Sequence, residues 1–366
     1  MTSADGQPGT LRRWNDYALG YGGEADALLC AAAELNPPVL IMGDGFDPRT
    51  LNTLKRLVLL GICPRVVCIP LPRGLGTGAS SVLARRNREG LAEIVSGTRV
   101  EIRHVVQPEG IDRLTVGSRV SRELVESGAI KSGDTVIVDI SALPSRLYFP
   151  LIGTFLALGE RDGEGELLVT VWENPVLDEK IRAVGADDAG PITGFAHGFS
   201  ADADRDQVRI WAPVLGEQQG PELEAIHALL QPQEVYPVLP FPAANPRRGD
   251  DLVLEYRTLL FDQFDVRPRD ILYVQENNPF DTYRALTGLN DRYRRTLAPL
   301  GEPLLITSIH GSKMLSVGVC LAAWESKLPV VTAGPSGYTL AEELELEWVV
   351  QTSTLACMWL HGLPYR

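Results

Sequence analysis

The sequence predicts an α/β protein built from two tandem Rossmann-like units, each a doubly wound parallel sheet, related by internal duplication. Three observations support this fold class. Apolar, β-branched runs of strand length recur along the chain. These runs fall into two sets with matching spacing. The periodic segments between successive runs, which are the candidate helices, are roughly 15 to 20 residues long, as in the crossover of a βαβ unit.

The two sets of predicted strands correspond in position. The first set is expected at residues 39–43, 65–71, 100–105, 134–141 and 166–172. The second set is expected at residues 208–213, 234–240, 270–275, 303–308 and 328–332. In both sets the second strand begins 26 residues after the first, at 65 after 39 and at 234 after 208. This regular spacing indicates that one unit was duplicated.

The strand sets divide the chain into five parts. These are an N-terminal extension (1–37), a first Rossmann-like domain (38–184), a linker (185–207), a second Rossmann-like domain (208–340) and a C-terminal closing segment (341–366). The linker is rich in Gly, Ala and Asp and has little apolar periodicity, as is typical of a connection. In the closing segment we expect an acidic helix near 340–346 and then an apolar stretch that packs back on the body.

Composition excludes several classes of protein. The net charge of −13 argues against a general DNA- or RNA-binding protein, because such proteins present a basic face, although a basic cleft on an acidic body stays open. The N-terminus lacks a signal pattern, and no run approaches the roughly 20 apolar residues of a membrane span, so we expect a cytoplasmic protein with no membrane partner. The five cysteines are scattered and lack metal-ligand spacing, so we expect reduced thiols, no metal and no cofactor.

The loop after the first predicted strand, MGDGFDPRT (42–50), is the first candidate site. Gly43 and Gly45 allow a tight turn, and Asp44 and Asp47 lie just before a predicted helix, where backbone amides favour an anion. The loop lacks the third glycine of G-x-G-x-x-G, so it does not predict a dinucleotide dehydrogenase. The alternative is that the two aspartates only cap a turn. In the second half the corresponding loop contains Gly216.

The loops after the fourth strand of each half form the second candidate site. Both leave an apolar strand through small and hydroxyl residues and reach a cation near a helix start. In the first half, VDISALPSR, the candidate residues are Asp139, Ser141, Ser145 and Arg146. In the second half, ITSIHGSK, the candidate residues are His310, Gly311, Ser312 and Lys313.

These motifs resemble a known family. The order Asp139, Ser141, Arg146 resembles the acidic, hydroxyl, basic signature after the fourth strand of CRISPR-associated Rossmann-fold (CARF) domains, and residues 308–324 resemble the Gly-Thr-Lys-Met loop and small-residue helix of the same group. Two such units in one chain resemble SAVED domains, over most of residues 38–340. The second half departs from the signature, with Thr307 and Ile309 at the positions of the acid and the hydroxyl.

The resemblance implies a sensor of a cyclic oligonucleotide or related nucleotide signal, in a prokaryotic antiviral defence system. Lys313 and Arg146 would neutralise phosphates, and the three serines with the amides of the 311–312 turn would donate hydrogen bonds. Asp44 or Asp139 would accept from a ribose hydroxyl or a base amine. The chain carries no recognisable effector motif, so the output would pass to a separate protein partner or through self-assembly. The alternatives are an Arg146–Asp139 ion pair and a solvated Lys313.

An enzymatic function remains an alternative. CARF-like proteins include ring nucleases, so the resemblance implies a slow, metal-independent phosphodiesterase, for which His310 is the candidate acid or base. No second histidine or paired carboxylate is evident, which favours a ligand contact or a structural role for this side chain. A two-domain glycosyl- or phosphoryl-transferring enzyme and a non-catalytic assembly subunit are the other possibilities. Tyr148 and Tyr283, each near the start of a predicted helix, are candidates for stacking on a base.

Overall fold

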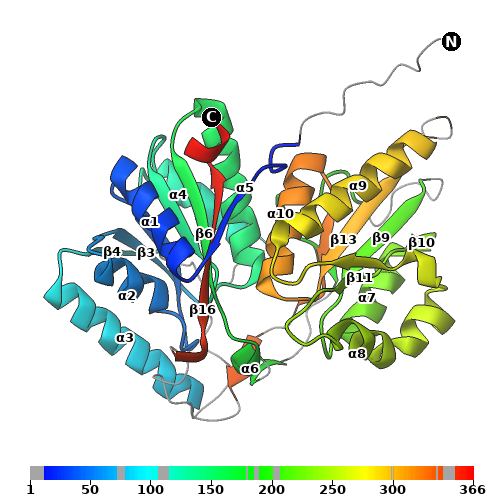
Figure 1. Ribbon diagram of the computed structural model, residues 1–366, viewed down its shortest axis with the longest axis horizontal. Coiled ribbons are helices and arrows are strands. Elements are labelled where there is room, and N and C mark those ends of the chain that lie inside the picture. The colour runs from blue at the N-terminus through cyan, green and yellow to red at the C-terminus, as the bar shows by residue number, and fades with distance from the viewer. Residues whose placement is uncertain are drawn as a thin grey trace.

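The computed structural model describes ten parts of the chain. They are residues 12–71, 79–105, 115–178, 180–184, 189–200, 207–297, 299, 301–334, 337–340 and 351–366. Within them the chain forms two seven-stranded sheets that lie beside one another, each flanked by helices, and a small two-stranded ribbon (Figure 1).

The first sheet is parallel over the five strands that the sequence predicts. Its spatial order is β1 (Ala18–Tyr21), β16 (Thr354–His361), β6 (Glu166–Glu173), β5 (Thr135–Asp139), β2 (Val39–Asp44), β3 (Arg65–Pro70) and β4 (Glu101–His104). The strand β16 is antiparallel to both of its neighbours. Every residue of β5 is buried, as expected for a central strand with helices on both faces.

The second sheet has the same core. Its spatial order is β12 (Leu272–Val274), β11 (Val238–Pro240), β9 (Arg209–Val214), β13 (Leu304–Ile309), β14 (Val330–Thr332) and β8 (Gly190–Pro191), with β10 (Glu234–Val235) also paired to β9. The strand β8 is antiparallel to β14, and the other pairs are parallel.

Both sheets have the same strand connectivity. When the five predicted strands of each half are numbered along the chain, both sheets have the spatial order 3-2-1-4-5. The order reverses between β2 and β5 in the first sheet and between β9 and β13 in the second. The predicted fold class of two doubly wound, Rossmann-like units is therefore confirmed. Ligands of such sheets bind outside the carboxyl ends of the strands, where the order reverses.

The helices follow the strands as the spacing predicts. Those of the first half are α1 (Gly23–Leu35), α2 (Asn52–Leu59), α3 (Ala79–Gly97), α4 (Val116–Glu126), α5 (Ser145–Asp162) and α6 (Pro175–Asp178). Those of the second half are α7 (Gly220–Leu230), α8 (Arg248–Glu255), α9 (Pro279–Leu297) and α10 (Lys313–Ser326). None of the helices in the described part of the chain is long and apolar enough to cross a membrane.

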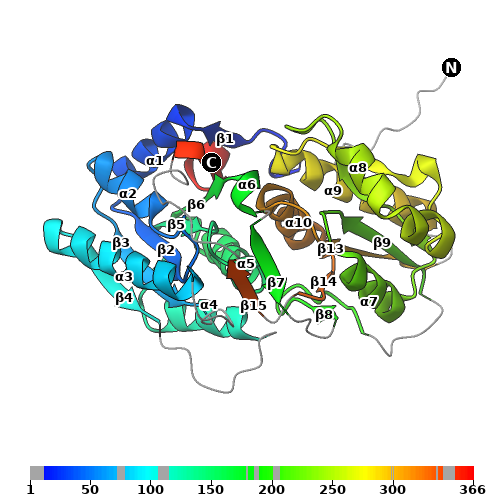
Figure 2. The same cartoon turned by 90° about the horizontal axis from the view of Figure 1, so that it is seen from below.

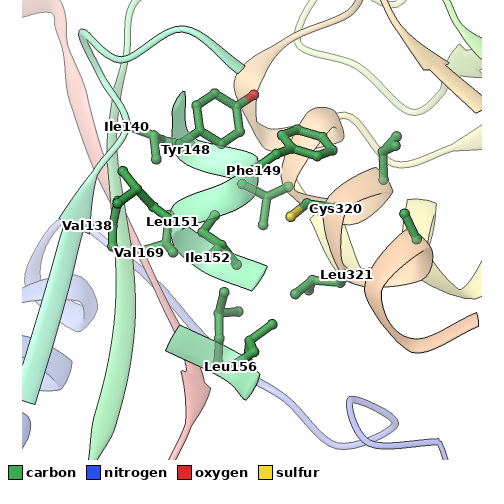
Figure 3. Close-up of a cluster of buried hydrophobic side chains, with 14 of the residues drawn as sticks. Val138, Ile140, Tyr148, Phe149, Leu151, Ile152, Leu156, Val169, Cys320 and Leu321 are labelled. Atoms are coloured by element: carbon green, nitrogen blue, oxygen red, sulfur yellow. The ribbon is translucent and has the colours of Figure 1, made fainter. Parts of the chain in front are cut away.

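The two halves share one apolar core. The helix α10 is buried from Met314 through Ala323, and such a helix must be covered on all sides. It packs against α5, where Phe149, Ile152 and Leu156 lie opposite Cys320 and Leu321 (Figure 3). The same cluster of buried side chains continues into β5 and β6 on one side and into β9 on the other.

The ends of the chain complete the first sheet, which the boundaries expected from the sequence do not anticipate. Residues 18–35 form β1 and α1, and residues 354–361 form β16, so neither end is a separate extension or closing segment. Before β1, the chain passes over the second half, where the buried Trp14 lies edge-on to Tyr283 and Trp324. The expected acidic helix falls on residues 341–346, which lie outside the described residues.

The linker also belongs to the folded body where it is described. Residues 190–191 form β8 at the edge of the second sheet. The antiparallel ribbon of β7 (Ile181–Val184) and β15 (Gly337–Leu340) joins the end of the first unit to the segment after β14. Seen from below, this ribbon lies between the two halves (Figure 2). Residues 185–188 and 201–206, which include the five aspartates of the linker, are outside the described residues.

Candidate interdomain ligand site

The carboxyl ends of both sheets lie at the same side of the molecule, at the bottom in Figure 1, where α6 lies between the halves. The Lys313 ammonium, on the second half, donates to the backbone carbonyl of Ile140 at 2.6 Å and to that of Ser141, both on the first half. The two loops after the fourth strands are therefore in direct contact, and the points of strand-order reversal face one another.

The loop after β2 is held in place by its own side chains. The guanidinium of Arg49, which is 2% exposed, binds Asp47 through Nε at 3.0 Å and Nη2 at 2.8 Å. The Asn87 amide on α3 donates to the carbonyls of Gly45 and Asp47 at 2.8 and 2.9 Å. Burial alone would raise the pKa of Asp47, but the adjacent guanidinium outweighs burial and holds the pKa below its usual range. Asp47 is therefore a structural anion.

The glycines of this loop leave room for the side chain of Leu71, which lies close to their backbone. A Cβ on Gly43 would lie 2.9 Å from Leu71 Cδ1, and a Cβ on Gly45 would lie 3.1 Å from the same atom. The space that the glycines open is thus filled by a side chain of the next crossover. Asp44 is half-buried, and its carboxylate lies 3.5 Å from Nε of the exposed Arg88.

Asp139 and Ser141 bind one another. The Ser141 hydroxyl donates to Asp139 Oδ1 at 2.5 Å, its backbone N–H donates to the same oxygen at 2.9 Å, and its Oγ accepts from the backbone N–H of Trp172 at 2.9 Å. Both side chains are buried, and burial raises the pKa of Asp139 although these hydrogen bonds oppose the rise. Asp139 and Ser141 therefore stabilise the conformation of the loop from its buried side.

The charged side chain of Lys313 lies between the two halves. Burial lowers its pKa to about 8, and the neighbouring Arg49 contributes to the lowering. The carboxylates of Asp47, Asp178 and Asp139 act in the opposite direction. A partly desolvated ammonium with a pKa this low gains from an additional anion, because a negative charge favours the protonated form.

In the second half, two glycines let the first and fourth loops touch. A Cβ on Gly216 would lie 1.8 Å from the His310 carbonyl oxygen, and a Cβ on Gly311 would lie 3.0 Å from the Leu215 carbonyl oxygen. His310 Nε2 lies 2.9 Å from Ser308 Oγ, and burial lowers the pKa of the imidazole to about 3. The ring is therefore neutral at pH 7, which argues against His310 as a general acid.

Two helices begin at this interface between the halves. Ser312 caps α10 by accepting from the backbone N–H of Leu315 at 3.4 Å, and the half-buried Ser145 is the first residue of α5. Arg146 follows it and is 9% exposed. The amide groups of both helix starts favour an anion between the halves. Tyr148 and Tyr283 are 2% and 0% exposed, so the prediction that they stack on a ligand is wrong.

The structure adds four charged residues that the sequence prediction did not include, namely Arg248, Glu217, Glu276 and Glu173. Arg248, at the start of α8, forms ion pairs with Glu217 at 2.6 Å and with Glu276. Glu173, at the end of β6, lies within electrostatic range of Arg248, and its pKa is raised to about 7 by burial and by Asp178, against the opposing effect of Arg248.

Two similar short segments of the sequence contain or adjoin some of these residues. The segments WENPVLD (172–178) and QENNPFD (275–281) share Glu, Asn and Pro, although they follow non-equivalent strands. In both, an Asn side chain accepts from a backbone N–H, of Leu177 in one case and of Phe280 in the other, at the start of a helix. The glutamates Glu173 and Glu276 then both lie near Arg248. The likeness therefore marks two similar helix starts on either side of the interface between the halves.

Comparisons with known proteins leave the function open. No protein-family model matches the chain, and no curated protein matches it. A solved structure from Pseudomonas aeruginosa UCBPP-PA14, described as a universal stress protein, aligns over 88% of this chain and 98% of its own, at 10% identity and a TM-score of 0.23. The functional argument therefore depends on the geometry of this interface.

This geometry suits the binding of an anion more than metal chemistry. Within the described residues no group of three or more His, Cys, Asp or Glu side chains is placed to hold a metal ion. The interface between the halves instead has a desolvated ammonium, two helix starts and a framework of carboxylates already bound to arginines.

Proposed function

We propose that this protein senses a nucleotide-type signal, a cyclic oligonucleotide or a related nucleotide, and binds its phosphate at Lys313 in the cleft between the two halves. The sensor acts in a prokaryotic antiviral defence system and passes its signal to a separate protein partner or through self-assembly. The resemblance of the two fourth-strand loops to CARF and SAVED domains motivates the ligand class.

The position of Lys313 is the observation that carries the proposal. Its ammonium reaches from one half to the backbone carbonyls of residues 140 and 141 on the other half, and in the described part of the chain no carboxylate forms an ion pair with it. Carbonyl dipoles stabilise an ammonium less than a full negative charge does. A phosphate that takes their place, or joins them, would gain both the charge of Lys313 and the amides of the two helix starts.

Thermal shift tests the proposal. The protein is melted with cyclic di-, tri- and tetranucleotides, with linear nucleotides and with nucleotide sugars, and the panel is repeated on Lys313→Ala and Arg146→Ala. A ligand at a hundred times its Kd stabilises the folded state by about 2.7 kcal/mol, which raises Tm visibly. Lys55→Ala, a change of an exposed lysine on α2, is the matched control and should respond like the unaltered protein.

The outcomes separate the candidate functions. A rise with a cyclic nucleotide that Lys313→Ala abolishes and Lys55→Ala retains supports the sensor. A rise only with nucleotide sugars would instead favour a transferase, and a response that survives Lys313→Ala would move the site elsewhere. No rise with any compound would favour the assembly subunit.

A second candidate function, an enzyme acting on the same ligand, is favoured by one observation. Glu173 has a pKa near 7, the range in which a carboxyl group acts as a general acid or base at neutral pH. Incubation of the protein with the ligand that gives the largest thermal shift, followed by chromatography of the products, tests it. Turnover that Glu173→Gln abolishes while binding persists would establish the enzyme.

A further inference from the structure

Three residues that are far apart in the sequence come within electrostatic range of one another around Tyr338. They are Arg146 in the first turn of α5, Glu222 in the first turn of α7, and Tyr338 on β15. The Tyr338 hydroxyl lies within electrostatic range of both Arg146 and Glu222. Of these, only Arg146 was expected at the site from the sequence.

Glu222 has an acceptor atom that protein groups leave unused. Its Oε2 is buried, and in the described part of the chain it has no hydrogen-bond partner. A buried acceptor without a donor is costly to the fold, so such atoms in folded proteins call for an explanation. A hydrogen-bond donor on a bound ligand is one explanation. Glu224, two residues later on the same helix, is exposed and offers no such position.

Tyr338 combines an exposed ring with a desolvated hydroxyl. The residue is 40% exposed, whereas burial at the hydroxyl end raises its pKa. The Arg146 guanidinium lies close to Gly334, in the segment that follows β14. A Cβ added to Gly334 would lie 3.6 Å from Arg146 Nη2. This part of the interface thus offers a flat aromatic surface, a cation and a carboxylate oxygen near one another.

We propose that this part of the interface binds the nucleoside part of the ligand, with a nucleobase stacked on the ring of Tyr338 and its amino group donating to Glu222 Oε2. Arg146 then faces the phosphate attached to that nucleoside. The assignment rests on the proposed function and extends it from the phosphate to the base.

The chemistry of the three groups predicts a preference among bases. Every base has a flat face, so stacking on Tyr338 is common to all of them. A carboxylate accepts a hydrogen bond from the amino group of adenine, guanine or cytosine, but it is repelled by the carbonyl oxygen that uracil has at the same edge. Glu222 should therefore favour amino-bearing bases over uracil.

Isothermal titration tests the assignment, with AMP, GMP, CMP and UMP and the cyclic dinucleotides of adenosine and uridine as probes. Tyr338→Leu should weaken every nucleotide by a similar factor, roughly 5- to 100-fold, whereas Tyr338→Phe keeps the ring and should bind as the unaltered protein does. Glu222→Gln should weaken the amino-bearing nucleotides by roughly 5- to 50-fold and leave the uridine compounds almost unchanged.

Two matched controls and two distinct failures complete the test. Tyr273→Leu removes another exposed tyrosine, which is on the edge strand β12, and Glu224→Gln changes the exposed neighbour on α7; both should bind normally. If nucleotides bind the unaltered protein and Tyr338→Leu and Glu222→Gln bind them with the same affinities and base preference, this assignment is overturned and the proposed function stands. If the unaltered protein binds none of these probes and none of the cyclic tri- and tetranucleotides of the thermal-shift panel, both are overturned.

Discussion

Gly216 lies directly against the carbonyl of His310, so that a Cβ at position 216 would stand 1.8 Å from the His310 oxygen. Through this contact the loop after β9 packs on the loop after β13, at the point where the strand order of the second sheet reverses. Because one contact partner is backbone, the overlap has no flexible side chain that could move aside.

Gly216→Ala should therefore destabilise the protein, by about 2 kcal/mol or more, since the two loops must separate to admit one methyl group. The matched control is Gly288→Ala on α9, where a Cβ would meet nothing within 4 Å. In a helix that change should be neutral or stabilise by up to about 1 kcal/mol. Urea denaturation of both variants measures the difference, and equal midpoints would contradict the close approach.

Arg49 should contribute far more to the stability of the protein than an arginine in an exposed ion pair, such as Arg85. Arg49→Ala leaves the buried Asp47 without its guanidinium, and removal of one partner of a buried pair costs about 3 to 5 kcal/mol. Arg85→Ala removes an exposed pair with Glu89 on α3 and should cost less than about 1 kcal/mol. Chemical denaturation at pH 7 compares the two. A small effect of Arg49→Ala would mean that the loop after β2 reorganises without it.

Glu173 should make stability depend on pH in the acid range. Its pKa is about 7 in the folded protein against 4.5 for an ordinary glutamate, so between these values the folded state holds a proton that the unfolded chain has released. Stability then falls as pH rises from 4.5 to 7, on the order of 3 kcal/mol. Glu173→Gln should flatten this fall, whereas Glu224→Gln should retain it. Melting curves at pH 5, 6 and 7 give the comparison.

Lys313 should contribute the opposite slope at alkaline pH. The folded protein loses the Lys313 proton near pH 8, whereas an ordinary lysine keeps it to 10.5, so the unfolded chain binds more protons in this window. Stability at this site therefore rises with pH from 8 to 10.5. The difference in stability between the unaltered protein and Lys313→Met isolates the slope. A constant difference across the window would show that the ammonium is not desolvated.

Binding of an anion at Lys313 should take up protons. At pH 8 the ammonium is about half protonated, and a bound phosphate would raise its pKa and complete the protonation. Titration of the best-binding nucleotide in two buffers of different ionisation enthalpy should reveal an uptake of roughly half a proton, absent in Lys313→Met. Identical apparent enthalpies in both buffers would place the phosphate away from this lysine.

The positions of the core strands along the chain could be anticipated because their signals are local. Runs such as 39–43 and 135–139 are rich in apolar and β-branched residues, and the segments between them are long enough for parallel crossovers. The positions of the candidate residues at strand ends follow from the same pattern. Gly43, Asp139, Gly311 and Lys313 accordingly all lie at the carboxyl ends of their sheets.

The partners of those residues could not be anticipated, because they come from elsewhere in the chain. Asp139 binds Ser141 beneath the loop, Lys313 reaches across to Ile140, and Glu173 and Glu276 approach Arg248 from opposite halves. Likewise, nothing local to residues 354–361 indicates that they pair with β6 of the first sheet, about 190 positions earlier.

The sequence by itself determined the two α/β units, their internal correspondence and the edges at which chemistry is expected, since periodicity and crossover length are properties of short segments. Only the tertiary structure decided that the halves share a core through α5 and α10, that the chain ends complete the first sheet, and which charges meet at the interface between the halves. These relationships depend on contacts between distant segments, whose energies arise only when the whole chain has packed.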